Sequence, residues 1–219
     1  MFPSILWCDE DLVAVNKPAG LPTLPDGYDR SAPHVKGLLE PTLGRLWIVH
    51  RLDRECSGIL LLARSARVHR FLNDQFASHQ VIKEYLALAR GNPDWEEERV
   101  NLPLRADVGH CHRTVVDHDK GKPAVTHFHL VKRLEDFTWL KAVPETGRTH
   151  QIRVHLAALG LPIAGDKLYG GALLPGQLPL ARLALHAYSL AFKASPTDKR
   201  ICLLAPFPPD LEKLFDIEE

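Results

Sequence analysis

Short runs of apolar residues, bounded by turn residues, predict that strands make up most of this chain. We expect strands at residues 4–7, 12–15, 46–49, 58–63, 82–89, 183–192 and 201–204. Residues 82–89 alternate as a strand does, which places Lys83 and Tyr85 on the same face. Several further strand candidates lie between residues 100 and 143.

Helical spacing occurs in fewer places. Ser65 is a typical N-cap residue, and the apolar positions after it are three or four residues apart, which predicts a helix that reaches Phe76. A second helix is predicted over about residues 149–159, where Gly160 ends it. Pro209 begins a short acidic helix near the C-terminus.

This order of elements favours an α+β fold with a mixed, largely antiparallel sheet flanked by helices and loops. Strands follow strands, and few units alternate strictly between strand and helix. The proline- and glycine-rich stretch 17–33 predicts an irregular loop. The chain has no internal repeat and no linker long enough to require a boundary, so we expect residues 1–219 to form one domain.

The composition is that of an ordinary globular protein, with 219 residues of which 45% are hydrophobic and 25% are charged. The longest apolar run, residues 59–63, is far shorter than a membrane span, and the N-terminus lacks the features of a signal peptide. Cys8, Cys56, Cys111 and Cys202 form no C-x-x-C pair, which favours free thiols in a reducing compartment. We therefore expect a soluble cytoplasmic protein.

The segment 50–58 is a polar insertion between two predicted buried strands. Asp53 lies in it between Arg51 and Arg54, and these cations favour the ionised carboxylate. An ionised, positioned carboxylate can act as a nucleophile or stabilise a developing cation. The alternative is a solvated connection with incidental ion pairs, and residue spacing alone does not decide between the two.

A second polar segment, residues 146–155, coincides with a predicted helix start. Helix N-termini offer N–H donors and positive potential, and Arg148, His150 and Arg153 add further donors. The segment is therefore either a site for an anion such as phosphate or an amphipathic helix with a basic polar face. His155 lies on the apolar stripe, so we expect it to be a hydrogen-bonded core histidine.

The middle of the chain is rich in histidine. Residues two apart in a strand share a face, so His110 with His112, and His127 with His129, would form a metal-binding face. No spacing matches a known zinc motif, and solvated strand histidines are the default interpretation. The chain also lacks glycine-rich nucleotide loops and a G-x-S-x-G motif, so we expect neither a metal nor a cofactor.

Six short motifs, in the same order along the chain, resemble those of the RluA family of RNA pseudouridine synthases. They are residues 15–21, 50–60, 83–85, 146–155, 165–170 and 185–187. Any one string can arise by chance, but the six together cover nearly the whole chain. Cys56 stands where the family usually has threonine, in a position expected to support the loop. The pattern begins almost at Met1, so the chain resembles the shorter members without an N-terminal RNA-binding domain.

The resemblance implies a pseudouridine synthase fold and a role for particular residues. It implies that Asp53 is the catalytic carboxylate, that Arg153 is its ionic partner, and that Tyr85 stacks on the uracil and offers a hydroxyl for proton removal from carbon 5. Substrate-binding roles are expected at Arg51, Leu52, Arg148, His150, Gln151 and Leu185.

The implied reaction breaks the bond from ribose to the uracil nitrogen, turns the base and rejoins it through carbon 5. It needs neither a redox step nor an energy source, in agreement with the missing nucleotide motifs. The target uridine has to leave the helical stack to reach the carboxylate. The expected partner is a structured RNA, a stem-loop of tRNA and/or 23S rRNA, and we expect a monomer with no obligate protein partner.

The charge distribution suits such a partner only locally, because the 27 basic and 27 acidic residues cancel. Basic residues concentrate in 45–90, and acidic residues in 94–98 and 210–219, which predicts a basic RNA-binding face with an acidic reverse. Two alternatives remain: a non-catalytic RNA-binding module, and a metal-dependent hydrolase that uses His110, His112, His127 and His129.

Overall fold

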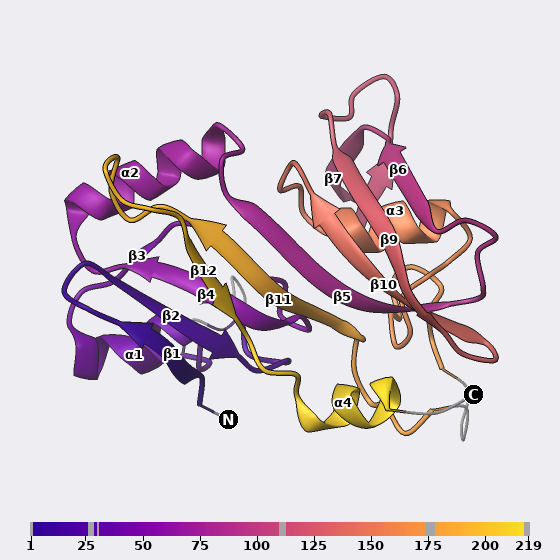
Figure 1. Ribbon diagram of the computed structural model, residues 1–219, viewed down its shortest axis with the longest axis horizontal. Coiled ribbons are helices and arrows are strands. Elements are labelled where there is room, and N and C mark those ends of the chain that lie inside the picture. Colours follow the sequence, from indigo (N-terminus) through magenta and orange to yellow (C-terminus); the bar gives the residue numbers. More distant parts are fainter. Residues whose placement is uncertain (1, 26–28, 30, 110–112, 174–177, 217–219) are drawn as a thin grey trace. The chain divides into compact units, whose positions relative to one another are not determined.

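The computed structural model describes residues 2–25, 29, 31–109, 113–173 and 178–216 (Figure 1). The strands are β1 (Ser4–Cys8), β2 (Leu12–Lys17), β3 (Trp47–Ile48), β4 (Ser57–Ala63), β5 (Ile82–Arg90), β6 (Glu97–Asn101), β7 (Leu104–Val108), β8 (Arg113–Val116), β9 (Val125–Arg133), β10 (Phe137–Pro144), β11 (Leu185–Phe192) and β12 (Ile201–Leu204). The helices are α1 (Val35–Leu43), α2 (Ala66–Ala77), α3 (Gln151–Ala158) and α4 (Pro209–Phe215).

The chain divides into two compact units. Unit 1 comprises residues 1–83 and 187–206, and unit 2 comprises residues 84–186 and 207–219. Strand β5 begins in unit 1 and ends in unit 2, and β11 passes in the opposite direction. The expectation that residues 1–219 form one domain stays a prediction.

Unit 1 is built around β2 and β4, which pair antiparallel from Leu12 opposite Ala63 to Lys17 opposite Gly58. Strand β1 pairs with β2, β3 pairs with β4, and β12 pairs with β11, all antiparallel. Every residue of β4 is buried, which explains its continuous apolar sequence. Helix α2 begins where the Ser65 side chain accepts from the backbone N–H of Val68, and it packs against β3 and β4.

Gly58 allows β4 and β11 to approach closely within unit 1. Its backbone has a φ of +113°, which favours glycine. A Cβ atom at this position would overlap the backbone N, C and O atoms of Ala187 on β11. The glycine is therefore required both by its conformation and by the neighbouring strand.

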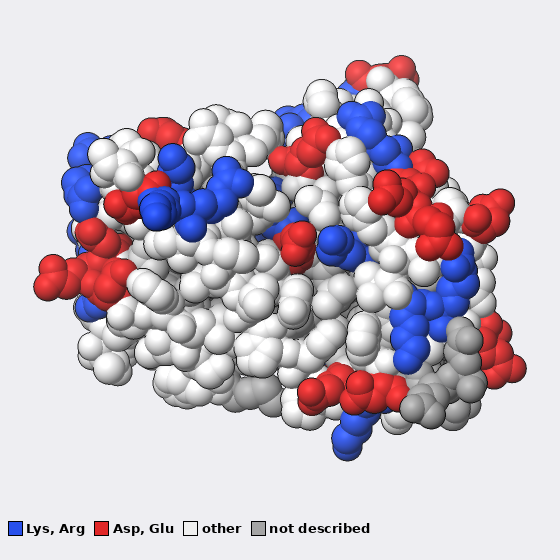
Figure 2. Space-filling model, viewed as in Figure 1, with Lys and Arg blue, Asp and Glu red and all other residues white. Residues whose placement is uncertain are grey.

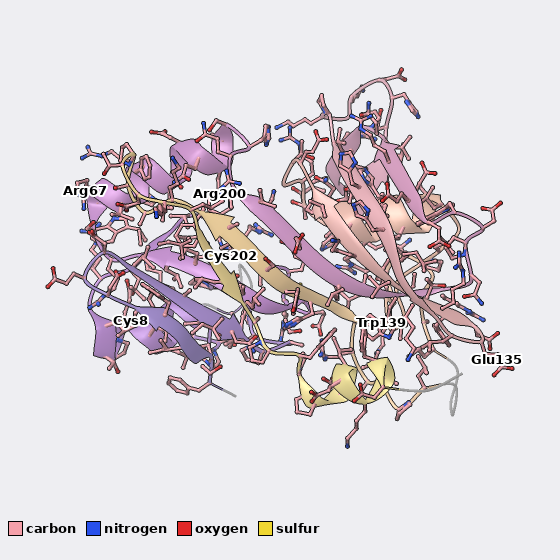
Figure 3. The ribbon with its side chains drawn as sticks, in the orientation of Figure 1. Cys8, Arg67, Glu135, Trp139, Arg200 and Cys202 are labelled. Carbon is pink, nitrogen blue, oxygen red and sulfur yellow. The ribbon has the colours of Figure 1, made fainter. Side chains whose placement is uncertain are left out.

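Unit 2 contains an antiparallel series of strands in the order β5, β10, β9 and β6, and a separate β7–β8 pair. Helix α3 packs against β8, β9 and β10. Helix α4 lies over Trp139 of β10, which is fully buried and contacts Phe207 and Phe215 (Figure 3). A bidentate ion pair from Arg182 to Asp210, with N–O distances of 2.6 and 2.9 Å, also fastens α4.

These observations confirm the expected α+β fold and most of the predicted elements. The predicted strand at 46–49 is shorter than expected, because only Trp47 and Ile48 pair with β4. Helix α1 was not predicted, since Pro41 lies inside it and normally argues against a helix. Burial of Val35 and Leu39 holds this helix in spite of the proline.

No helix in the described ranges is long and apolar enough to cross a membrane. Cys8, Cys56 and Cys202 are free thiols, and Cys111 lies outside the described residues.

Candidate active site

Asp53 lies in the loop that joins β3 to β4, between two residues whose backbone is anchored. The backbone N–H of Leu52 donates to Thr23 Oγ1 at 3.3 Å, and that hydroxyl lies 3.2 Å from the carbonyl oxygen of Leu52, to which it donates. The carbonyl oxygen of Arg54 accepts from the backbone N–H of Gly20 at 2.8 Å. The segment before α1 therefore holds the loop on both sides of Asp53.

Lys17 adds a buried cation to this anchorage. Its side chain is fully buried, and its Nζ donates to the carbonyl oxygens of Pro18, Leu21 and Arg54 at 3.0, 2.8 and 3.0 Å. Lys17 is the last residue of β2 and pairs with Gly58, near the start of β4. The strand pairing therefore places Lys17 next to the end of the Asp53 loop. Three carbonyl acceptors match the three N–H donors of an ammonium group.

The end of the loop is closed by Cys56, which is 2% exposed. Its backbone N–H donates to the carbonyl oxygen of Asp53 at 3.1 Å, and its thiol donates to the carbonyl oxygen of Ser57 at 3.4 Å. A cysteine thus fits as a loop-supporting residue where threonine is usual. Arg51 is exposed, and Arg54 Nε donates to the carbonyl oxygen of Gly20 at 3.1 Å.

His50 precedes the loop and is held as a neutral acceptor. Its Nε2 accepts from the backbone N–H of Leu61 at 2.9 Å, and its ring stacks on Phe76 at 4.8 Å. Burial, together with the nearby positive charge of Lys83, lowers the pKa of His50 from 6.5 to about 3. Burial also lowers the pKa of Lys83 from 10.5 to about 8. His50 is therefore uncharged at neutral pH.

In unit 2, Tyr85 and Leu185 occupy the strand positions that the sequence predicts. Tyr85 of β5 is half-buried and pairs with Ala142 of β10. Leu185 begins β11 and is 3% exposed. Both are candidates for contact with a base, because one offers an aromatic ring and the other an apolar surface.

The turn before α3 is organised by the buried side chain of Gln151. Its Oε1 accepts from the Thr146 hydroxyl at 2.7 Å and from the backbone N–H of Arg148 at 3.0 Å. Its Nε2 donates to the carbonyl oxygen of Val125 and to Thr126 Oγ1, both at 2.9 Å. The amide of Gln151 is thus engaged inside unit 2, where it fixes the turn that carries Arg148.

Arg153 of α3 forms a buried bidentate ion pair with Asp166. Its Nε and Nη2 donate to the two carboxylate oxygens at 2.7 and 2.8 Å, and the side chains are 7% and 0% exposed. The same carboxylate accepts from the backbone N–H groups of Leu168 and Tyr169 at 3.0 and 3.3 Å. Such geometry fixes the plane of the guanidinium group. The role of Arg153 as partner of Asp53 stays a prediction.

His155 is the core histidine that the sequence predicts. It is fully buried, and its two ring nitrogens lie 2.9 Å from Thr126 Oγ1 and 3.2 Å from the carbonyl oxygen of Leu102. Burial lowers its pKa below 6.5.

The histidines considered for a metal site are placed only in part. His127 contacts Glu145 at 2.6 Å, and His129 contacts Glu97 at 3.2 Å. His110 and His112 lie outside the described residues. In the part of the chain that the structure describes, no three potential ligands gather into a metal-binding group.

Comparison with known proteins decides the family. A family model described as RNA pseudouridylate synthase matches residues 11–158, which is more than half of the chain. The chain belongs to the RNA pseudouridylate synthase family. Members of this family are isomerases that convert uridine in RNA to pseudouridine. RNA pseudouridine synthase activity is therefore supported, and the binding-module and hydrolase alternatives are not favoured.

Several curated relatives are similar over nearly the whole chain. The ribosomal large subunit pseudouridine synthase C of Pasteurella multocida is 40% identical over 96% of this chain, which spans 66% of that relative. The dual-specificity RNA pseudouridine synthase RluA of the same organism is 37% identical, with 92% of each chain covered. An uncharacterized RNA pseudouridine synthase of Zymomonas mobilis is 40% identical, with 93% of each covered.

Solved structures show the same fold as this RNA pseudouridylate synthase. Human RNA Pseudouridylate Synthase Domain Containing 1 matches with a TM-score of 0.78 and 27% identity, over 95% of this chain and 86% of that one. Human RNA Pseudouridylate Synthase Domain Containing 4 matches with a TM-score of 0.75 and 25% identity, over 95% and 90%. The expected pseudouridine synthase fold is thereby confirmed.

The structure groups the predicted residues into two sets and adds others. Unit 1 carries Arg51, Leu52 and Asp53 on one loop, and the remaining predicted residues belong to unit 2. Residue spacing indicated no role for Lys17, Thr23, Asp166 or Tyr169. Lys17, Asp166 and Tyr169 lie inside the short motifs 15–21 and 165–170. The signs available in the sequence were a charged residue in each motif and the glycines beside it.

Proposed function

We propose that this synthase isomerises uridines in structured RNA, a stem-loop of tRNA and/or 23S rRNA, with Asp53 as the catalytic carboxylate. The observation that carries the proposal is the double anchorage of the loop, because Leu52 and Arg54 on either side of Asp53 are held by Thr23, Gly20 and Lys17. A carboxylate on a fixed backbone needs little reorganisation when it reacts.

The base contacts are assigned to unit 2. We assign Tyr85 to stacking on the flipped uracil and to the removal of the proton from carbon 5, and Leu185 to the apolar wall of the uracil pocket. Arg153 is proposed as the ionic partner of Asp53. Its bidentate contact with Asp166 supports this proposal because it holds the guanidinium group rigid.

The RNA backbone is proposed to contact exposed or half-exposed donors. Arg51 is exposed on the loop of unit 1, and Arg148 and His150 are partly exposed at the start of α3. Leu52 and Gln151 are buried, and their bonds lie inside the protein. We therefore propose that these two residues shape the binding loops rather than contact RNA directly.

The charged surface adds only a modest long-range attraction. Figure 2 shows small groups of basic and acidic side chains in alternation on this face. Arg67 on α2 and Arg200 before β12 belong to unit 1 and are both exposed (Figure 3). The basic face with an acidic reverse stays a prediction, and RNA shape is expected to contribute strongly to recognition.

The curated relatives described above come from bacteria, and their names are those of RNA-modifying enzymes. On that basis we propose that this chain acts in the cytoplasm as a monomer without an obligate protein partner. Light scattering of the purified protein, with and without RNA, tests the monomer directly.

The decisive experiment is tritium release from RNA labelled at carbon 5 of uridine, with unmodified tRNA and unmodified 23S rRNA as separate substrates. The wild type is expected to release tritium from at least one of them. Asp53→Ala and Asp53→Asn are expected to abolish release, by at least about 1,000-fold, while RNA binding and melting temperature stay close to wild type.

Glu55→Gln is the matched control, because Glu55 is an exposed carboxylate of the same loop whose N–O distance to Arg54 is 4.0 Å. It is expected to retain activity. Loss of RNA binding by Asp53→Ala, with its fold intact, would assign Asp53 to recognition instead. Release that depends on metal and stops with EDTA would favour the hydrolase alternative, and tight binding without release would favour the binding module.

A further inference from the structure

Tyr169 joins three parts of unit 2 that are distant in sequence. Its ring packs on the apolar cluster of Leu104, Ala124 and Val154, and the guanidinium carbon of Arg153 lies 5.0 Å from the ring centroid. Its hydroxyl lies 2.9 Å from the backbone nitrogen of Thr114 and 2.8 Å from Nδ1 of His150. None of the roles assigned so far uses this hydroxyl.

The hydrogen-bond count at this hydroxyl favours one direction. The backbone N–H of Thr114 can only donate, so it occupies an acceptor site of the phenolic oxygen. Burial raises the pKa of Tyr169 above its ordinary 10.0, so the hydroxyl keeps its hydrogen at neutral pH. If His150 Nδ1 also donated to the phenolic oxygen, neither Thr114 N–H nor His150 Nδ1 could accept the phenolic hydrogen. A bond from Tyr169 to His150 Nδ1 uses every donor.

His150 is held in an unusual position by its backbone as well. It is the N-cap residue of α3 and has φ 53° and ψ 21°, a left-handed conformation that histidine adopts less often than glycine. Its ring lies edge-on to that of Tyr169, at 5.6 Å and 76°. The backbone conformation and the ring contact together fix the position of the imidazole. His150 is partly exposed, as is Arg148 two residues before it.

We propose that Tyr169 is a positioning residue that fixes His150 as the tautomer protonated at Nε2, so that Nε2–H donates to a phosphate oxygen of the bound RNA. This inference rests on the proposed function, since it assigns the RNA contact of His150 to one atom. A neutral donor of fixed direction discriminates geometry without adding net charge, which suits a protein whose basic and acidic residues cancel.

The tautomer is read by ¹⁵N NMR of the labelled protein at pH 7.5, with the His150 signals assigned by their loss in His150→Gln. In the wild type, Nδ1 is expected to be fully unprotonated and Nε2 fully protonated. In Tyr169→Phe, which keeps the ring over Arg153 and removes only the hydroxyl, the two tautomers are expected to exchange. A protonated Nδ1 in the wild type, or an unchanged tautomer in Tyr169→Phe, overturns the proposal.

Kinetics on tritium-labelled RNA test the use of the donor. Tyr169→Phe and His150→Gln are each expected to raise KM by about tenfold with little change in kcat, which is the effect of one hydrogen bond to a charged acceptor. The double variant is expected to match His150→Gln alone. Additive effects would show that Tyr169 acts on stability or on Arg153, and would overturn its role through His150.

Tyr188→Phe is the matched control, because Tyr188 is a half-buried tyrosine on β11 and belongs to unit 1. It is expected to leave KM and the His150 signals unchanged. If the wild type neither releases tritium nor binds RNA, the proposed function fails and the RNA contact fails with it. The NMR result still decides the Tyr169–His150 bond in that case, so the two failures are distinguishable.

Discussion

At the residue scale, Lys17 is the buried charge on which the backbone of the Asp53 loop depends. Lys17→Met keeps most of the volume but removes the ammonium donor from the carbonyl oxygens of Pro18, Leu21 and Arg54, and the Arg54 oxygen keeps only its bond from the backbone N–H of Gly20 among the contacts described above. We expect a loss of about 2–4 kcal/mol in the free energy of unfolding. Because Arg54 adjoins Asp53, kcat should also fall more than KM changes. Urea unfolding and steady-state tritium release measure the two effects.

Lys36→Met is the matched control for this prediction. Lys36 lies on α1 of the same unit, its side chain is 33% exposed, and its Nζ lies 3.6 Å from Glu40 Oε1. Such a surface pair contributes little, so the control should lose less than about 1 kcal/mol. Equal losses in the two variants would mean that the carbonyl contacts of Lys17 do not stabilise the loop.

His50 makes the stability of the fold depend on pH. The pKa of His50 is about 3 in the folded chain, whereas in the unfolded chain it has its ordinary value of 6.5. Between pH 3 and pH 6.5 the unfolded chain therefore binds a proton at His50 that the folded chain does not bind. The free energy of unfolding therefore falls as the pH falls from 6.5 toward 3, and this contribution is constant above 6.5. His50→Gln keeps an acceptor for the Leu61 N–H but cannot titrate.

Urea unfolding at pH 7.5 and pH 5.0 measures this effect. The wild type should lose about 1–2 kcal/mol more than His50→Gln between the two pH values. The exposed His118 offers a control, and His118→Gln should keep the pH dependence of the wild type. Identical profiles for His50→Gln and the wild type would show that His50 is not held neutral by the fold.

At the element scale, Gly58 sets the separation of β4 and β11 within unit 1. Gly58→Ala forces a Cβ atom into the backbone of Ala187, which cannot move without breaking the strand pairing. It also places a side chain at φ +113°. We expect a loss of about 2–4 kcal/mol and a lower melting temperature, seen by circular dichroism.

Gly160→Ala separates the strain of positive φ from the steric overlap. Gly160 follows α3 with φ +75°, and an added Cβ would meet no atom within 4 Å. Its expected cost is about 1 kcal/mol, from the backbone conformation alone. A Gly58→Ala variant no less stable than Gly160→Ala would contradict the close packing of β4 and β11.

At the scale of the whole molecule, the chain passes between the two units three times: within β5, within β11, and between Pro206 and Phe207. Strands β5 and β11 each have their first two residues in one unit and the remaining residues in the other. Melting one unit would disrupt both strands, since each has residues in the two units, so we expect a single cooperative transition in calorimetry, with equal calorimetric and van't Hoff enthalpies. Two resolved transitions would show two domains and would contradict the expectation of one.

Much of the fold was predictable because it depends on local patterns. Ser65 and the apolar spacing after it determine α2, and the two apolar runs at β2 and β4 are buried because no polar group interrupts them. Helix α1 was not predicted, because the strongest local signal in its sequence, Pro41, disfavours a helix. The tertiary burial of Val35 and Leu39 outweighs that local preference.

By itself, the sequence determined most of the strands, the helices α2, α3 and α4, the core histidine and the motifs that resemble the family to which the chain belongs. Only the tertiary structure decided that Lys17 clamps the Asp53 loop, that Asp166 holds Arg153, and that Tyr169 reaches His150. Lys17 and Arg54 are 37 residues apart, and Thr114 and Tyr169 are 55 apart. A periodic pattern reports which face of an element is buried. It carries no information on which polar group from a distant segment meets another, because that depends on how the chain closes.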